Sequence, residues 1–203
     1  MTKGLVYILD DDPAICRAVQ RLLALHGYEN QCFRRPMEFI GRSDLGEAGP
    51  ACAIVDLNMP GLTGMQLQEH LQERGETLPL IFITGQADVP SCALAMKRGA
   101  IDFLLKPFRE AELIACVENA LQACIRLKYS QQVGLAARQH YDQLTVREAE
   151  VLNLMVQGLP NKLMADRLGI AEKTVKVHRA HVMQKMETHN LVELIRAVDA
   201  LKR

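Results

Sequence analysis

The chain has 203 residues, of which 49% are hydrophobic, and its formal net charge is zero. That length allows one large core or two modest ones, since domains usually hold about 100–150 residues. The zero net charge hides an asymmetry, because residues 1–125 carry 11 Lys and Arg against 16 Asp and Glu, whereas residues 143–203 carry 10 against 7. An acidic part and a basic part favour two domains with different partners.

The apolar residues and the cysteines argue against a membrane protein or a secreted one. No stretch approaches the roughly 20 apolar residues that a membrane-spanning helix needs, and the apolar run after residue 4 is too short for a signal peptide. The 6 cysteines have irregular spacings and no C-x-x-C pair. We therefore expect a cytoplasmic protein with no membrane partner, whose thiols are reduced and mostly buried.

Residues 1–125 alternate short apolar runs with amphipathic helical stretches, which is typical of a parallel α/β sheet. A helix is predicted over 14–26, with Asp12 as its N-cap, Pro13 at its first position and Gly27 as its stop. Strands are predicted at 5–9, 28–33, 52–55, 80–84 and 101–105. Five such repeats predict a doubly wound, five-stranded parallel sheet with its ligand site at the carboxyl ends of the strands.

The rest of the chain has a helical pattern. A helix is predicted from about residue 110 toward a polar stretch at 129–142. Four further helices are predicted near 145–157, 161–168, 172–187 and 190–201. We therefore expect one domain at 1–125, a helical linker at 126–142 and a small all-α domain at 143–203.

Polar side chains gather at the predicted carboxyl ends of the strands. They are Asp10, Asp11, Asp56, Thr84 and Lys106. Phosphoryl transfer to a carboxylate needs a nucleophilic oxygen, a divalent cation and donors for the phosphoryl oxygens, and this set supplies each part. Taken singly, the three aspartates also have an ordinary structural explanation as turn residues, and Thr84 has one as a common strand-ending residue. Their joint placement favours the chemical interpretation.

Four motifs of this half resemble the receiver domain of bacterial response regulators. They are ILDDD at 8–12, VDLNMPGLTG at 55–64, TG at 84–85 and LKPF at 105–108, and the resemblance covers residues 5–122. It implies a flavodoxin-like fold in which Asp56 accepts phosphate from a sensor histidine kinase. It also implies that Asp11, Asp56 and the Asn58 carbonyl hold Mg²⁺ or Mn²⁺, that Asp10 acts through water, and that the bond before Pro107 is cis.

The same resemblance implies a conformational switch. Thr84 would move toward the phosphoryl group while Phe103 turns inward; the alternative is that Phe103 is a static core aromatic. Asn58 and Gln86 stand two residues beyond Asp56 and two beyond Thr84, so we expect them to border the approach of water to phosphorylated Asp56 and to set how long that state lives. The alternative is that both amide side chains merely face solvent.

The segment 172–186 is rich in cationic side chains. Such side chains favour binding to nucleic-acid phosphates, because binding releases counterions from the nucleic acid. Val175, Val182 and Met186 recur at helical spacing and are expected to face the core. A solvated basic helix face is the alternative. A metal site at His178 and His181 is disfavoured, because neither a cysteine nor a third histidine lies nearby in the sequence.

A helix, a turn at 169–171 and a second helix match a helix-turn-helix. The segment 143–203 resembles the LuxR-type output domain of NarL/FixJ-class regulators, through LTVREAEVL at 144–152, GLPNK at 158–162, Ala165, LGI at 168–170 and TVKVHR at 174–179. The resemblance implies that Thr145 and Glu148 form a capping box and that the helix at 172–187 enters the major groove. Expected DNA contacts are Lys173, Thr174, Lys176, Val177, His178 and Arg179. Pro160 departs from the usual capping Ser or Thr, so Asn161 or a shifted start is expected to cap that helix.

The two resemblances together predict a two-component response regulator that is not an enzyme. Phosphorylation of Asp56 would control dimerisation and sequence-specific binding to a double-stranded promoter site, with RNA polymerase a further candidate partner. One alternative is a phosphatase of the haloacid dehalogenase type, but such enzymes carry a second Asp two residues after the nucleophile, where this chain has Asn58. The other is a phosphorylation-independent regulator whose receiver serves only for dimerisation.

Overall fold

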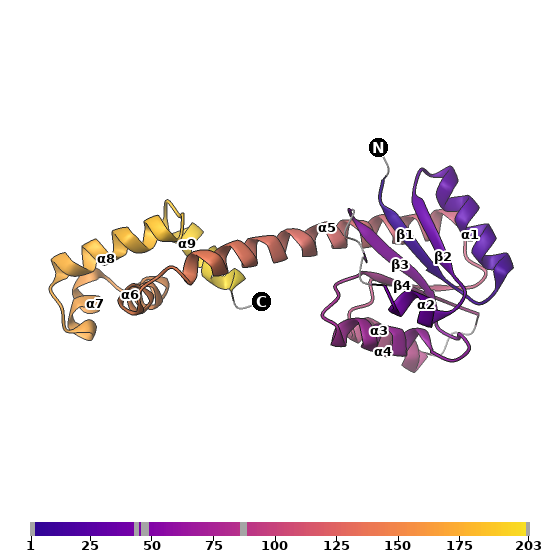
Figure 1. The fold of residues 1–203 in the computed structure, drawn as a ribbon, viewed down its shortest axis with the longest axis horizontal. Helices are drawn as coiled ribbons and strands as arrows, with labels where there is room; N and C mark the ends of the chain where they lie inside the picture. The colour runs from indigo at the N-terminus through magenta and orange to yellow at the C-terminus, as the bar shows by residue number, and fades with distance from the viewer. Residues whose placement is uncertain (1–2, 43–44, 46–48, 86–88, 202–203) are drawn as a thin grey trace. The chain divides into compact units, whose positions relative to one another are not determined.

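The structure, a computed structural model, describes residues 3–42, 45, 49–85 and 89–201 (Figure 1). The chain divides into two compact units, Met1–Leu127 and Lys128–Arg203. None of the helices in the described part of the chain is long and apolar enough to cross a bilayer.

The first unit contains a five-stranded parallel sheet in the order β2-β1-β3-β4-β5 (Figure 1). Its strands are β1 (Leu5–Leu9), β2 (Glu29–Phe33), β3 (Ala51–Asp56), β4 (Leu80–Thr84) and β5 (Asp102–Leu105). The predicted doubly wound sheet is therefore confirmed, with strand ends that differ from the expected ones by a residue. The side chains of β3 are buried along its whole length, which explains its continuous apolar sequence.

Helices cover both faces of this sheet. They are α1 (Pro13–Leu25), α2 (Pro36–Ile40), α3 (Gly64–Glu73), α4 (Val89–Lys97) and α5 (Glu110–Tyr141). α1 and α5 pack on one face, where Ile8, Ile54 and Ile83 lie at the centre of a buried cluster. α2, α3 and α4 pack on the other face around Val55 and Phe82. The expected linker segment at 126–142 falls on the second half of α5, which ends at Tyr141.

The start of α1 follows from three consecutive residues. Asp12 has extended backbone, and its carboxylate accepts a hydrogen bond from the Ala14 N–H at 2.7 Å. Pro13 occupies the first helical position, where a missing N–H costs nothing. At the other end Gly27 has φ of 80°, a left-handed conformation that glycine adopts without strain. This arrangement fixes the direction in which the chain leaves β1 at Asp10 and Asp11.

The expectation that every cysteine is reduced is wrong for one pair. Cys16 of α1 and Cys32 of β2 form a disulfide, with their Cα atoms 6.3 Å apart. The physical reason is that α1 packs beside β2, which brings two cysteines distant in sequence within bonding range. Cys52, Cys92, Cys116 and Cys124 are free.

The second unit is helical. It contains α6 (Val146–Val156), α7 (Asn161–Leu168), α8 (Glu172–Lys185) and α9 (Leu191–Ala200), together with the last part of α5. Val151, Leu152, Met164, Val175 and Val182 form the centre of its core. The prediction of a small all-α part after the sheet is confirmed.

Local signals explain the start of α6 and the end of α7, but not the start of α7. Thr145 and Glu148 form the expected capping box at the start of α6. Pro160 occupies the cap position of α7 without a side-chain hydrogen bond, and Asn161 is the first helical residue, so neither residue provides the expected cap. Gly169 ends α7 in the left-handed region with φ of 63°, which allows the sharp turn into α8.

Glu148 does more than cap α6. Its buried carboxylate also accepts a hydrogen bond from Lys185 Nζ of α8 at 2.7 Å. The Lys185 ammonium, together with the Thr145 N–H, lowers the pKa of Glu148 to about 2. An ionised carboxylate therefore joins two helices of this unit.

Glu148→Ala is expected to lower the free energy of unfolding of this unit at pH 7 by about 1.5–3 kcal/mol, the range for hydrogen bonds to a charged group. The folded state lowers the pKa of Glu148. The stabilisation that the ionised carboxylate gives to the folded state is therefore complete above pH 4.5, the ordinary pKa of a glutamate, and is lost as the pH falls through about 2. Urea unfolding followed by the NMR signals of Val151 and Val182 measures both effects. Glu150→Ala, at a half-exposed ion pair on the same helix, should cost less than about 1 kcal/mol.

Candidate functional site

Three carboxylates meet at the carboxyl ends of β1 and β3. Oxygen atoms of Asp10, Asp11 and Asp56 all lie within 4.8 Å of one another. The register explains this, since Leu9 of β1 pairs with Val55 of β3 and the next residue in each strand direction is an aspartate. Asp10 is fully buried and Asp56 nearly so, whereas Asp11 is half-buried.

Lys106 bridges two of these carboxylates from the end of β5. Its Nζ donates to Asp10 Oδ2 at 2.7 Å and to Asp56 Oδ2 at 2.8 Å. Burial alone would lower the pKa of Lys106, but the hydrogen bonds to the two carboxylates outweigh it and raise that pKa. Burial raises the pKa of Asp10, against the opposing effect of Lys106 and of the Asp12 N–H. The peptide bond between Lys106 and Pro107 is cis.

Asn58 and Thr84 complete the pocket on its β4 side. The Asn58 N–H donates to Asp56 Oδ1 at 3.2 Å, and the Asn58 amide nitrogen lies 3.4 Å from the Thr84 hydroxyl. Thr84 is fully buried at the end of β4, while Asn58 is exposed. Phe103 of β5 is half-buried against the core beneath α3 and α4. Gln86 lies outside the described residues.

The donor set fits a small hard cation. Carboxylate oxygens from Asp10, Asp11 and Asp56 lie close together, and the main-chain carbonyl of Asn58 is a further oxygen donor in the same loop. Mg²⁺ and Mn²⁺ prefer oxygen ligands of this kind and keep several waters. The half-buried position of Asp11 leaves room for such waters.

A groove of about 1010 Å³ borders this cluster and was not predicted. Asp11 and Gly61 line it together with Arg34 and Arg35, which follow β2 directly. The lining also contains Glu38, whose carboxylate lies 3.9 Å from the Arg35 guanidinium, so the two arginines are balanced by Asp11 and Glu38. The sequence signal for this groove is the pair of arginines directly after the predicted strand at 28–33.

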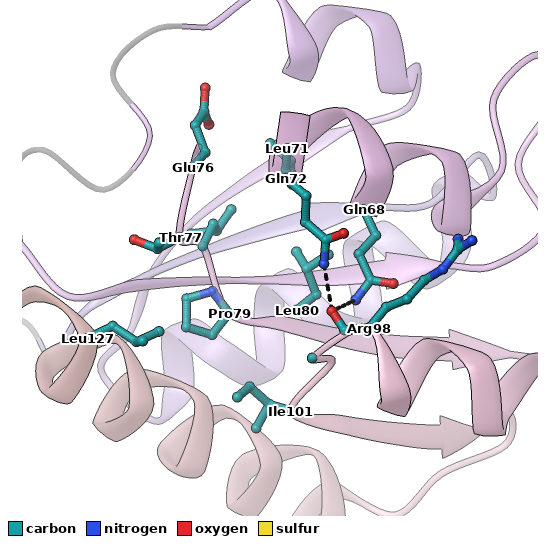
Figure 2. Close-up of a pocket in the computed structure, with 12 residues that line it drawn as sticks. Gln68, Leu71, Gln72, Glu76, Thr77, Pro79, Leu80, Arg98, Ile101 and Leu127 are labelled. Atoms are coloured by element: carbon teal, nitrogen blue, oxygen red, sulfur yellow. Dashed lines mark hydrogen bonds between the residues drawn. The ribbon is translucent and has the colours of Figure 1, made fainter. Parts of the chain in front are cut away.

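A second cavity, of about 200 Å³, lies at the opposite end of the sheet (Figure 2). There the amide nitrogens of Gln68 and Gln72 both donate to the Arg98 carbonyl, at 3.2 and 2.6 Å (Figure 2). These bonds hold α3 against the end of α4. Since Pro79 and Leu80 at the start of β4 line the cavity, it lies away from the carboxylates.

The predicted DNA-contacting residues all lie on α8, the second helix of the helix-turn-helix. Val175 and Val182 are buried in the core, as their spacing predicted. Lys173, Thr174, Lys176 and Val177 are exposed, and Arg179 is half-buried. His178 is also half-buried, but its Nδ1 atom is buried and a ring nitrogen lies close to Glu148 of α6, so it is less available to DNA than the other predicted contacts. The apolar Val177 side chain is 48% exposed between cations, which suits contact with base edges as well as phosphates.

Comparison with known families gives two matches. The model described as "Response regulator receiver domain" matches residues 6–118, and the model described as "Bacterial regulatory proteins, luxR family" matches residues 142–198. Together they cover more than half of the chain.

Whole-chain relatives agree with these matches. The chain is 38% identical over 200 residues to the response regulator protein TmoT of Ectopseudomonas mendocina, covering 98% of this chain and 90% of that one. It is 35% identical over 195 residues to the transcriptional regulatory protein FixJ of Bradyrhizobium diazoefficiens, covering 96% and 94%. Among solved structures, the response regulator StyR aligns with a TM-score of 0.76 at 37% identity, covering 98% and 99%. Full-length FixJ from B. japonicum aligns with a TM-score of 0.59 at 34% identity, covering 100% and 98%.

Lys106→Ala is expected to destabilise the first unit at pH 7 by about 1–3 kcal/mol in the absence of divalent cations, because buried Asp10 loses its cationic partner. Without Lys106 the pKa of Asp10 rises further. The loss of unfolding free energy should therefore become smaller as the pH falls and the Asp10 carboxylate becomes protonated. Urea unfolding in EDTA at pH 7 and pH 4 measures the loss of unfolding free energy at each pH. Arg109→Ala, which removes an exposed cation nearby, should cost less than about 1 kcal/mol at both values. An equal loss from Lys106→Ala at the two pH values would contradict the electrostatic explanation.

Proposed function

The chain belongs to the family of response regulators that join a receiver domain to a LuxR-type DNA-binding domain, and we propose that phosphorylation of Asp56 by a sensor histidine kinase controls its binding to DNA. Membership makes the chain a two-component regulator of transcription. The observation that supports the finer proposal is the Asp56 carboxylate, held at 2.8 Å by Lys106 beside two further aspartates.

Phosphorylation requires a displacement at phosphorus. A carboxylate oxygen of Asp56 attacks the phosphoryl group on the kinase histidine, an O–P bond forms, and the N–P bond breaks as the imidazole takes up a proton. Asp11, Asp56 and the Asn58 carbonyl would hold Mg²⁺ or Mn²⁺, with Asp10 acting through water. When bound, that ion neutralises charge on the phosphoryl oxygens.

Two other side chains would bind the phosphoryl oxygens. Lys106 is already within hydrogen-bond reach of Asp56 and can transfer one of its donors to a phosphoryl oxygen. The Thr84 hydroxyl can donate to another after a short movement. We infer that this movement frees the space into which Phe103, half-buried at present, would turn.

Asn58 and Gln86 would set the lifetime of phosphorylated Asp56. The Asn58 main-chain N–H donates to Asp56, and its side-chain amide lies 3.4 Å from the Thr84 hydroxyl, which supports a role for that amide in ordering water near the phosphoryl group. An amide can orient water but cannot take its proton, so slow hydrolysis is expected. This argues against a phosphatase, since no carboxylate stands at position 58 to act as general acid, and the relatives are transcriptional regulators.

Phosphorylation would promote dimerisation and binding to a two-fold-related promoter site. Paired helix-turn-helix units read paired half-sites. α9 is the candidate dimer surface in the DNA-bound form, since Leu191 and Val192 at its start are exposed apolar residues. RNA polymerase is a further candidate partner of the bound dimer.

Asp56→Asn is expected to abolish labelling of the chain by acetyl phosphate or by a phosphorylated histidine kinase, because an amide is not a nucleophile of this kind. Chelation of divalent cations should stop labelling of the unsubstituted chain. Asp12→Asn is the matched control, because asparagine caps a helix as well as aspartate does, and it should be labelled normally. Persistent labelling of the Asp56→Asn chain would move the phosphoryl acceptor to another residue.

Lys176→Ala and Arg179→Ala are each expected to weaken binding to the preferred DNA site by about 1–3 kcal/mol and to change the base preference, if these side chains contact base edges. Binding to randomised duplexes at several salt concentrations measures both properties. Lys3→Ala removes one cation from the first unit and should leave both unchanged. A uniform loss across all sequences with a shallower salt dependence would instead assign the residue to phosphate contact.

A further inference from the structure

Two histidines of α8 and one glutamate of α6 converge in the second unit. A carboxylate oxygen of Glu148 and a ring nitrogen of each of His178 and His181 all lie within 4.8 Å of one another. The spacing of the histidines places both on one side of α8, but their sequence neighbourhood contains no third ligand. The fold supplies that third ligand from another helix.

The Glu148 carboxylate is held in a fixed orientation. Its side chain is 5% exposed, and its Oε2 atom accepts hydrogen bonds from Lys185 Nζ at 2.7 Å and from the Thr145 N–H at 2.9 Å. The other oxygen, Oε1, lies 3.5 Å from His181 Nδ1. Partners that fix one carboxylate oxygen in this way are typical of the groups that orient a metal ligand.

The separation between Glu148 Oε1 and His181 Nδ1 is informative. At 3.5 Å it is longer than the usual range of an N–H···O hydrogen bond. Two ligands that each lie about 2.0–2.1 Å from a tetrahedral zinc ion are separated by about 3.3 Å. The observed separation is close to that of two ligands of one ion, and it is also within the range of an ion pair between the two side chains.

His178 gives a second and independent indication. Its Nδ1 atom is buried and has no hydrogen-bond partner among the described residues. Buried polar atoms of this kind are rare in folded proteins and call for an explanation, such as an ion or a water. The ring of His181 is 52% exposed, so the cluster can be reached from solvent.

We propose that Glu148, His178 and His181 bind one divalent transition metal ion of the zinc type, with water as the fourth ligand on the His181 side. Two imidazoles and one carboxylate favour zinc over Mg²⁺, which prefers oxygen ligands. Oε1 of Glu148 would bind the ion while Oε2 remains with Lys185. The ion would thus connect the first turn of α6 to the middle of α8, the helix that carries Lys176 and Arg179.

Zinc titration of the full chain, stripped of metal and kept in excess Mg²⁺ to fill the aspartate pocket, tests the proposal. We expect one zinc ion to shift the imidazole NMR signals of His178 and His181 and to raise the melting temperature of the second unit. His181→Ala should weaken this binding by about tenfold or more. Because that ring is half exposed, the substitution should leave the unit folded.

His189→Ala is the matched control, since His189 is an exposed histidine of the same unit outside the cluster. It should bind zinc as the unsubstituted chain does. Cobalt titration adds a second measurement, because thiolate and imidazole ligands give different absorption spectra and the chain has free cysteines. Equal zinc affinity of the unsubstituted and His181→Ala chains, a thiolate spectrum, or unmoved signals of His178 and His181 would each overturn the proposal.

Discussion

The pocket at the strand ends depends on one ammonium group. Lys106 Nζ lies 2.7 Å from a carboxylate oxygen of Asp10 and 2.8 Å from one of Asp56. Without that positive charge, closely packed carboxylates with one fully buried member would repel each other and take up protons. Ionised carboxylates are what a divalent cation and a nucleophilic attack both need. The lysine therefore keeps the carboxylates of the site ionised, and the sheet holds them in position.

The parallel sheet makes that geometry unavoidable. β1, β3, β4 and β5 are neighbours that run in the same direction, so the residues that follow them meet at one edge. Asp10, Asp56, Thr84 and Lys106 each stand at or just beyond such an end. This placement could be predicted from sequence because buried parallel strands are continuous apolar runs whose ends are easy to locate. The register then follows from the topology.

Features that depend on packing between distant segments could not be predicted in this way. The disulfide between Cys16 and Cys32 was missed because nothing in their spacing shows that α1 packs beside β2. The cap of α7 was misjudged, because side-chain chemistry suggested Asn161 and the backbone begins that helix after Pro160 without a side-chain bond. Sequence patterns predict local backbone geometry well. They predict contacts between side chains that are distant in the sequence only where a known motif implies those contacts.

Glu148 illustrates how one residue can have a role that its motif does not reveal. The motif predicts a capping box, which requires only that the carboxylate reach back to Thr145. Reaching back fixes the side chain where α8 crosses the first turn of α6, so Lys185 occupies one oxygen and the other is directed to His181. The cap and the ion pair already restrict the side-chain rotation of Glu148 in the metal-free protein, so little conformational entropy remains to be lost when a metal ion binds. Pre-organisation of this kind lowers the entropic cost of binding, so a local folding signal can prepare a site on another helix.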